Sequence, residues 1–403
     1  MLFKVAWRNI WRNKTRSLVI IAAVSIGLWA GFFLMSFYNG LIEQRIRAAI
    51  ETEISHIQIH HPQFLNDYDI QYFIPNSKQL LEQTIRNPLL KAITCRVVIK
   101  GMISTASGSS GIQINGVVPR EEDRVTQLQN KLTNGKYFPG SNPYEIIVSE
   151  KTLKKLKLKL NAKTILTFQD KDGNIGSGAF RIVGVYETVN SPYDEANVFV
   201  NIRDIDTLAG IRQHYNEVAL LLKKGNDVEN VKHQLQREYP QLEIKTWTEM
   251  SPEMSLLVTA SDQAMLIYMS IIMLALAFGI INTMLMAVLE RTREIGMMLA
   301  LGMNRLKVFT MISLETTFLV LAGTPVGIAC GLATIAYTSK HGINLSQFSE
   351  AYSSLGYSSL IYPTFNVRQF FLMLAMVIIT ALIASLLPAR RALKLNPATA
   401  IRQ

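Results

Sequence analysis

The chain has 403 residues, of which 49% are apolar, and a formal net charge of +11. This length allows either two soluble domains or one soluble domain with a membrane part. The positive charge does not indicate nucleic-acid binding, because the central segment, residues 38–262, carries 26 basic and 26 acidic side chains and so has no electrostatic footprint.

The first 16 residues predict a cytoplasmic amphipathic elbow helix. Its apolar face would carry Phe3, Ala6, Trp7, Ile10 and Trp11, and its basic face Lys4, Arg8 and Arg12. The basic region before an apolar run also resembles a signal peptide. The apolar run is longer than in such peptides and no small-residue cleavage site follows Phe37, which favours an uncleaved anchor.

Four apolar windows predict membrane-spanning helices at residues 17–37, 265–289, 308–337 and 370–387. The third window contains Glu315 as its single charged residue. The surplus basic residues lie in the amino end, in the connector 290–307 and in the tail 388–403. By the positive-inside rule these three segments are cytoplasmic, whereas the large central segment and the loop 338–369 are extracytoplasmic.

Residues 38–264 predict an α+β extracytoplasmic domain. Strand patterns occur at 54–60, 93–99, 111–118, 164–168, 180–186, 196–201, 217–222 and 242–246, and helical patterns at 121–132, 149–156 and 227–238. The Asp170–Gly178 stretch predicts a hairpin turn, and a cluster of turn residues between Pro119 and Tyr144 indicates a break between two lobes. Helical periodicity at both ends of the domain predicts rigid stalks that continue the first two spans.

The sequence offers neither a catalytic nor a metal site. His56 and His60 would lie about 13 Å apart on one strand face, too far to share a metal ion. The GSSG stretch at Gly108–Gly111 reads as a loop, and the Gly135-Lys136 pair lacks the upstream glycine of a phosphate-binding loop. Cys95 and Cys330 fall in different compartments and do not predict a disulfide.

The connector ERTREIGMMLALGM, Glu290–Met303, predicts a short amphipathic helix with Ile295, Met298, Leu299 and Gly302 on one face. Such a face suits a groove on a partner protein, where methionine adapts its shape. It suits the lipid headgroup region equally well.

This connector resembles that of the permeases grouped with MacB, FtsX and the lipoprotein-releasing LolC and LolE proteins, the type VII ABC transporters. Leu314-Glu315 before a glycine-rich helix, and the ending PARRALKLNPATAIR, are also similar to that family. The start WRNIWRNKTRS and the later HIQIHHP look like its lipoprotein-releasing members. The resemblance covers the whole chain and implies a bacterial inner-membrane protein with four spans, both termini inside and its large domain in the periplasm.

The resemblance also implies partners. A cytoplasmic ABC ATPase, in two copies, would bind ATP and magnesium, and a second permease, identical or homologous, would pair with this chain. Force from the ATPase would act on a substrate outside the membrane, which is mechanotransmission. The implied ATPase-coupling residues are Glu290, Arg291, Glu294, Gly296, Met298, Leu299 and Gly302. No catalytic residue and no cofactor is expected in this chain.

Two features of the third span have alternative explanations. Gly323, Gly327 and Gly331 form a small-residue face that packs either within one subunit or against a second one. Glu315, near the cytoplasmic end, is expected to pair with a basic residue rather than to carry protons, because no other span contains an acidic residue for a relay.

Three functions remain open: lipoprotein release, MacB-type export of peptides, toxins or drugs, and FtsX-like signalling to a cell-wall hydrolase. For an acylated cargo, candidate groove residues are Phe32, Phe33, Met35, Phe37, Leu41, Ile267, Met269 and Ile272. A periplasmic chaperone or adaptor is a possible partner. The joint QDKDGNIGSG is short and polar where the chaperone-recruiting Lol permease has a protruding hook, which argues against direct chaperone recruitment by this chain.

Overall fold

The computed structural model describes the whole chain except residues 1–6, 9–10, 13, 212–213 and 394–403. The chain forms two compact units. The helical unit comprises Met1–Ile42, Thr259–Asn344 and Leu360–Gln403, and the α/β unit comprises Glu43–Val258 and Leu345–Ser359.

Parts of two predicted segments fall outside the described residues. In the predicted elbow, Trp7, Arg8, Trp11 and Arg12 are helical, whereas Phe3, Lys4, Ala6 and Ile10 are not described. The predicted tail 388–403 is described to residue 393.

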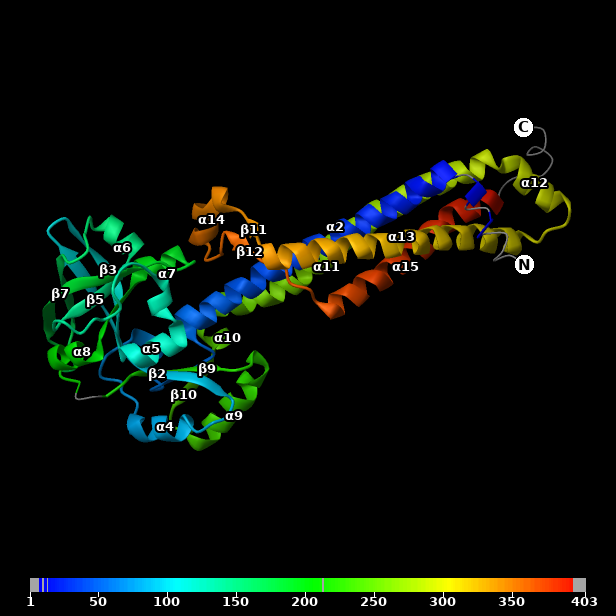
Figure 1. Cartoon of the computed structure of the whole chain (residues 1–403). Coiled ribbons are helices and arrows are strands. Elements are labelled where there is room, and N and C mark those ends of the chain that lie inside the picture. Colours follow the sequence, from blue (N-terminus) through cyan, green and yellow to red (C-terminus); the bar gives the residue numbers. More distant parts are fainter. Residues whose placement is uncertain (1–6, 9–10, 13, 212–213, 394–403) are drawn as a thin grey trace. The chain divides into compact units, whose positions relative to one another are not determined.

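Four long helices dominate the helical unit (Figure 1). They are α2 (Lys14–Ala48), α11 (Pro252–Glu290), α13 (Arg305–His341) and α15 (Val367–Leu393). Each is long and apolar enough to cross a membrane, which confirms the four predicted spans. Each extends beyond its predicted window at both ends, because a hydropathy window marks only the part suited to hydrocarbon.

Both predicted stalks are helical. A π-helical turn, η1 (Ala49–Ile54), follows α2 directly, so the chain stays helical from residue 14 to residue 54. The second predicted stalk is the first part of α11, which has no break before Glu290. The predicted strand at 54–60 is correspondingly shorter, because Ile54 belongs to η1.

One apolar core joins the long helices. Val24, Met269, Leu319 and Val377 are among its buried members, one from each helix. Apolar side chains such as Phe278 also cover the outer helix surfaces. Helices that are apolar all round are typical of membrane spans.

A turn divides the predicted connector at 290–307. Its helix, α12, covers only Thr292–Ala300, and α13 already begins at Arg305. Gly302 ends the connector helix with a left-handed φ of 88°, which favours glycine. Asn304 caps α13 by accepting a hydrogen bond from the Leu306 amide at 3.0 Å.

The loop between α13 and α15 contains short elements. It consists of β11 (Ile343–Asn344), η4 (Ser346–Phe348), α14 (Ser349–Ser354) and β12 (Leu360–Ile361). The two strands pair antiparallel in a sheet of their own.

A ten-stranded mixed sheet forms the frame of the α/β unit (Figure 1). Its order is β10-β1-β9-β2-β3-β8-β5-β7-β4, and β6 pairs with both β2 and β7. The strands are β1 (Ile57–His60), β2 (Leu90–Thr105), β3 (Gly108–Val117), β4 (Leu132–Gly135), β5 (Glu145–Ser149), β6 (Lys163–Gln169), β7 (Ile175–Tyr186), β8 (Asn197–Asn201), β9 (Glu217–Leu222) and β10 (Glu243–Thr246).

All eight predicted strands are present in this sheet, whereas its other two strands, β4 and β5, and the loop strands β11 and β12 were not predicted. β5 is buried along its whole length and therefore lacks the alternation that reveals a half-buried strand. The hairpin predicted at Asp170–Gly178 is confirmed, because β6 and β7 pair antiparallel around residues 170–174. The loop predicted at Gly108–Gly111 is wrong, since those residues open β3 and pair with β2.

Short helices cover the sheet. They are α3 (Phe64–Asp67), α4 (Ser77–Thr84), α5 (Pro119–Thr126), α6 (Glu150–Lys155), α7 (Ser191–Ala196), α8 (Ile202–Ala209), α9 (Val228–Glu238) and α10 (Trp247–Met250), with 3₁₀ turns η2 (Leu128–Lys131) and η3 (Gly225–Asp227). The helix predicted at 121–132 is divided, because Gln127 adopts a left-handed conformation and ends α5.

Two apolar cores meet along β2. On one face of this strand, Ile93 and Cys95 belong to one core, whereas Val97, Ile99 and Ile103 belong to the other. The break predicted between Pro119 and Tyr144 is therefore wrong. A strand of 16 residues is long enough to serve two cores in succession, so the division needs no loop.

Candidate functional site

Six ionic side chains gather at one end of the helical unit, beside the connector helix α12. This charge cluster consists of Arg12, Arg16, Glu290, Arg291, Glu294 and Glu315. They come from the amino end, α2, the end of α11, the connector and α13. The cluster therefore links the connector to three of the long helices.

Glu315 is the buried centre of the charge cluster. Its Oε1 accepts a hydrogen bond from Nη1 of Arg291 at 3.0 Å and lies 3.9 Å from Nη2 of Arg16. The side chains of Glu315, Arg291 and Arg16 are 6%, 13% and 10% exposed. A lone buried carboxylate is unfavourable in this setting, so the two guanidinium groups supply the basic partners that the sequence predicted.

The pairs become more exposed away from Glu315. Arg16 also donates to Oε2 of Glu290 at 3.1 Å, and Arg12 donates to Glu294. The side chains of Glu290, Glu294 and Arg12 are 40–55% exposed. Exposed pairs contribute little to stability, so the inner pair with Arg291 dominates the energetics of the charge cluster.

A small cavity of about 30 Å³ lies beside the inner pair. Its lining combines Glu315, Arg291 and Glu294 with apolar side chains that include Ile295, Met298 and Ile312. This volume is enough for one water molecule, which the carboxylates and the guanidinium group could hydrogen-bond. Such a site leaves room for the ion pairs to rearrange.

The predicted connector face is turned largely toward the chain's own core. Ile295 and Gly296 are buried, and Met298 and Leu299 are half-buried against the core of the helical unit. Only Gly302 of that predicted face is exposed. The apolar side chains available to a partner are instead Met297, which is 45% exposed, and Leu301, which is 89% exposed.

Sequence reasoning missed this exposed edge. Arg293, Met297 and Leu301 are spaced four residues apart and follow one side of the connector. The stretch MMLAL, residues 297–301, places apolar side chains on two faces of the helix. The helical period of the sequence alone does not show which of the two faces inward. The helices against which α12 packs make that choice.

The glycine face of α13 packs against α2 of the same chain. An added Cβ at Gly323 would lie 2.8 Å from the carbonyl oxygen of Ile21, and one at Gly327 would lie 2.8 Å from that of Ser25. The Ser25 hydroxyl donates to the Gly323 carbonyl at 2.9 Å. Of the two explanations, packing within one subunit therefore accounts for these glycines, including Gly331, which faces Phe32.

The candidate cargo residues do not share one environment. Phe32, Met35 and Met269 are buried in the core of the helical unit, and Phe32 stacks on Phe370 at 4.9 Å. Ile267 is 59% exposed. Phe33, Phe37, Leu41 and Ile272 are half-buried. A cargo groove made by all eight would need a rearrangement of the helices, and their role stays a prediction.

The end of the first stalk is anchored within the α/β unit. Lys131 donates to the Thr52 hydroxyl in η1 and to the Thr126 carbonyl at 2.7 Å, and the Tyr193 hydroxyl donates to the Thr52 carbonyl at 3.2 Å. Burial lowers the pKa of Lys131 to about 8, against the opposing effect of nearby carboxylates that include Glu51. Two side chains of the sheet domain thus hold one residue of the π-helical turn.

Beside this anchor, Arg45 forms a second contact. Its Nη1 donates to Oε1 of Glu53 at 2.9 Å, and both side chains are largely buried. An added Cβ at Gly356 would lie 2.6 Å from Nε of Arg45, so the loop that follows α14 lies directly on this arginine. Residues 345–359 of the α13–α15 loop and the stalk end therefore form one packed region of the α/β unit.

The histidines predicted not to share a metal have other partners. His60 is buried, with Nδ1 3.1 Å from the Asn216 carbonyl and Nε2 3.0 Å from the Gln58 side chain. Nδ1 of His56 accepts from the Leu222 amide at 3.2 Å. Within the described part of the chain, no three His, Cys, Asp or Glu side chains lie close enough to hold a metal ion.

Two family models match the chain. The model described as the MacB-like periplasmic core domain matches residues 17–238, and the model described as the FtsX-like permease C-terminal matches residues 266–397. The first covers more than half of the chain. The first model ends at residue 238, the last residue of α9, and the second begins at residue 266, inside α11.

Curated relatives match over nearly the whole chain. The lipoprotein-releasing system transmembrane protein LolC of Neisseria meningitidis is 23% identical over 96% of this chain and 94% of its own length. An uncharacterized ABC transporter permease of Methanocaldococcus jannaschii is 23% identical over 98% of this chain and 96% of its own. The macrolide export ATP-binding/permease protein MacB of Escherichia coli K12 is 24% identical over 98% of this chain, which spans 60% of that protein.

Proposed function

Because the chain belongs to the family of ABC transporter permeases with a MacB-like periplasmic core domain and an FtsX-like carboxyl-terminal region, we propose that it is the membrane subunit of a lipoprotein-releasing complex. The observation that carries this proposal is the match to the lipoprotein-releasing protein LolC along almost the full length of both chains. The bacterial inner membrane, with the α/β unit in the periplasm, is the location that this function requires.

We infer that a separate ATPase docks on the exposed edge of the connector. Arg293, Met297 and Leu301 lie on its outer side and provide one cationic and two apolar contacts. Binding between a short helix and a groove depends on such side chains. ATP and magnesium would be held by that partner.

Movement of the connector would reach the α/β unit through the charge cluster and the stalks. Arg291 joins α12 to α13 through Glu315, and Arg16 joins the same carboxylate to α2. α2 continues without a break into η1, which carries the anchor residue Thr52. A continuous helix transmits an axial displacement, whereas a flexible loop would absorb it. Pairing with a second permease would bring two such stalks together.

The test begins with the tagged protein, purified from its native membrane in mild detergent, and mass spectrometry of everything bound. A soluble ATPase together with a triacylated lipoprotein supports the proposal. Leu301→Asp should reduce the recovered ATPase at least tenfold, whereas Phe348→Asp, an exposed apolar position in the α/β unit, should not. Absence of any ATPase from the preparation would overturn the permease mechanism.

The second candidate function is export of the MacB kind. It is favoured by the alignment of macrolide export proteins over 98% of this chain. In this case the same preparation should contain an adaptor and an outer-membrane duct in place of a lipoprotein. That result would retain the coupling mechanism and replace the cargo.

A further inference from the structure

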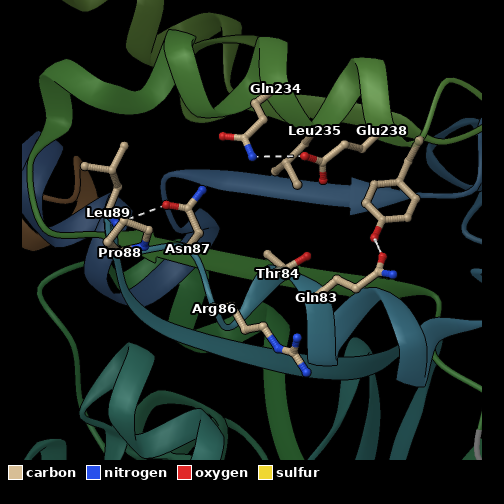
Figure 2. Close-up of a pocket in the computed structure, with 10 residues that line it drawn as sticks. Gln83, Thr84, Arg86, Asn87, Pro88, Leu89, Gln234, Leu235 and Glu238 are labelled. Carbon is tan, nitrogen blue, oxygen red and sulfur yellow. Dashed lines mark hydrogen bonds between the residues drawn. The ribbon is translucent and has the colours of Figure 1, made fainter.

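A cavity of about 740 Å³ lies in the α/β unit between the end of α4 and the face of α9. One wall comes from α4 and the loop that follows it, and the other comes from α9 and Tyr239 (Figure 2). The size is typical of ligand-binding pockets. This cavity takes no part in the mechanism proposed above.

One residue that lines the cavity, Thr84, has a buried hydroxyl group without a hydrogen-bond partner. Thr84 is 5% exposed, and its hydroxyl makes no hydrogen bond within the described structure. Threonines in helices commonly donate to the carbonyl four residues earlier, as Thr310, Thr316 and Thr324 do in this chain. Thr84 does not, and it lines the cavity beside Leu235 (Figure 2). Buried polar groups in proteins are normally hydrogen-bonded, so this hydroxyl is a candidate contact for a ligand.

The α4 wall offers hydrogen-bond donors. Asn87 uses its carbonyl oxygen to accept from the Leu89 amide at 3.0 Å, and Gln83 uses its carbonyl oxygen to accept from the Tyr239 hydroxyl. In each side chain the NH₂ group remains for a ligand. Figure 2 shows the Asn87 nitrogen on the side that faces α9. Arg86 also lines the cavity, with its guanidinium group turned away from α9 (Figure 2).

The α9 wall offers acceptors. Gln234 donates to Oε1 of Glu238 at 2.9 Å, which leaves the Gln234 carbonyl and the second Glu238 oxygen as acceptors for a ligand. The negative charge of Glu238 is on this wall, opposite the donors of the α4 wall (Figure 2). The cavity is thus polarised, with acceptors on one side and donors on the other.

A ligand that matches both walls has a cationic donor at one end and carbonyl acceptors beside it. The amino end of a peptide has this arrangement, because an ammonium group is followed by main-chain carbonyls. We propose that the cavity binds the amino-terminal end of a short peptide, with its ammonium group on Glu238 and its first carbonyls on Asn87 and Thr84. The negative charge of Glu238 would repel a simple anion. A sugar is a poorer match than a peptide, because its hydroxyl groups both donate and accept and do not require donors on one wall and acceptors on the other.

The test is calorimetric titration of the full chain in mild detergent with tetra-alanine amide, which has a free ammonium group. Saturable binding is expected, and N-acetyl tetra-alanine amide should bind about tenfold more weakly because it lacks the charge-assisted contact with Glu238. Glu238→Gln should abolish this difference between the two peptides. Glu229→Gln, an exposed position on the same helix outside the cavity, should preserve it.

Thr84→Val gives an independent measurement. It keeps the side-chain volume and removes the hydroxyl, so peptide binding should weaken about fivefold while the thermal unfolding midpoint stays unchanged or rises. Equal affinity of the native chain for both peptides, no saturable binding of either, or binding of maltotriose in their place would overturn the proposal. None of these results depends on an ATPase or a lipoprotein, so the proposed transport function is tested separately.

Discussion

Each of the two units buries one charged side chain between two side chains of the opposite charge. The central residue is an arginine in the α/β unit and a glutamate in the helical unit. In the α/β unit, Arg96 on β2 contacts Glu122 of α5 at 2.8 Å and Glu217 of β9 at 2.7 Å, and all three side chains are at most 7% exposed. In the helical unit, Glu315 lies between two arginines at 3.0 and 3.9 Å. We call the Arg96 contacts a closed set, because their distances are short and all three side chains are buried. The Glu315 contacts form a branched set, because one distance is longer and the arginines also lead to exposed partners.

This difference corresponds to what each unit is proposed to do. Arg96 donates from Nε, Nη1 and Nη2, which fixes a helix and two neighbouring strands in one geometry. Arg16 is shared between Glu290 and Glu315, so a small shift of α2 exchanges one partner for the other. A closed set suits a rigid domain, and a branched set suits helices that must move.

Arg96→Met should have the largest effect. It leaves Glu122 and Glu217 buried without a counter-charge, and we expect the free energy of unfolding of the α/β unit to fall by about 3–5 kcal/mol. Urea unfolding of the full chain in detergent measures this through Trp247, the only tryptophan of that unit in the sequence, after replacement of Trp7, Trp11 and Trp29 by Phe.

Arg124→Met is the control for that measurement, because Arg124 lies on the same helix as Glu122 but is exposed. Its effect should be below about 0.5 kcal/mol. A loss below about 1 kcal/mol for Arg96→Met would show that the closed set does not hold the sheet domain together.

Lys131, a half-buried cation that donates to Thr52 and to the Thr126 carbonyl, should give a pH-dependent effect on stability. Between its folded pKa of about 8 and the ordinary value of 10.5, the unfolded chain binds one more proton than the folded chain, so stability rises with pH in this window. The whole difference between the folded and the ordinary pKa corresponds to a change of at most about 3 kcal/mol in the free energy of unfolding. Urea unfolding at pH 7, 8, 9 and 10 measures the slope.

Lys131→Met should remove this contribution. As the pH rises above 8, the native chain should therefore gain stability relative to the variant. Lys136→Met, at an exposed position nearby, should leave the slope as it is. Identical pH profiles for the native chain and Lys131→Met would contradict the lowered pKa.

Glu315→Gln should have a smaller effect than Arg96→Met. Because the two arginines that remain keep other contacts or partial exposure, we expect the free energy of unfolding of the helical unit to fall by about 1–3 kcal/mol. Unfolding by SDS in mixed micelles measures it through Trp29, whose indole donates to Thr334 at 3.0 Å. Asp262→Asn, an exposed carboxylate of the same unit, is the control. A loss as large as that of Arg96→Met would remove the distinction between the two sets.

The smallest expected effect separates the two arginines around Glu315. Double-mutant cycles with Glu315→Gln should give a coupling energy of about 1–2 kcal/mol for Arg291→Met and below about 0.5 kcal/mol for Arg16→Met. The reason is the shorter, hydrogen-bonded contact of Arg291. Equal coupling energies would mean that both arginines hold Glu315 in the same way and that the set is closed.

Much of the fold was predictable because it depends on local periodicity. The four spans, the stalk helices and eight strands follow from hydropathy and alternation along the chain. β5 escaped because a strand buried on both faces has no alternation. The division of the two cores along β2 escaped because nothing within one strand marks a change of neighbours.

The candidate site was predictable only in part. Glu315 and the connector could be selected because a charge in a span and a short amphipathic helix are visible in the sequence. The pairing of Glu315 with Arg291 and Arg16 brings together residues 24 and 299 positions apart. Which face of α12 is exposed, and so which of its apolar residues a partner can reach, likewise depends on packing between distant helices.

The sequence by itself determined the class of the protein, its spans and its family, because hydrophobic length, charge asymmetry and short motifs are properties of contiguous residues. The tertiary structure alone decided that the glycines of α13 pack on α2, that Leu301 is exposed while Ile295 is buried, and that Thr84 lines a polarised cavity. Each of these depends on contacts between segments far apart in the chain, and local periodicity carries no information about which segments those are.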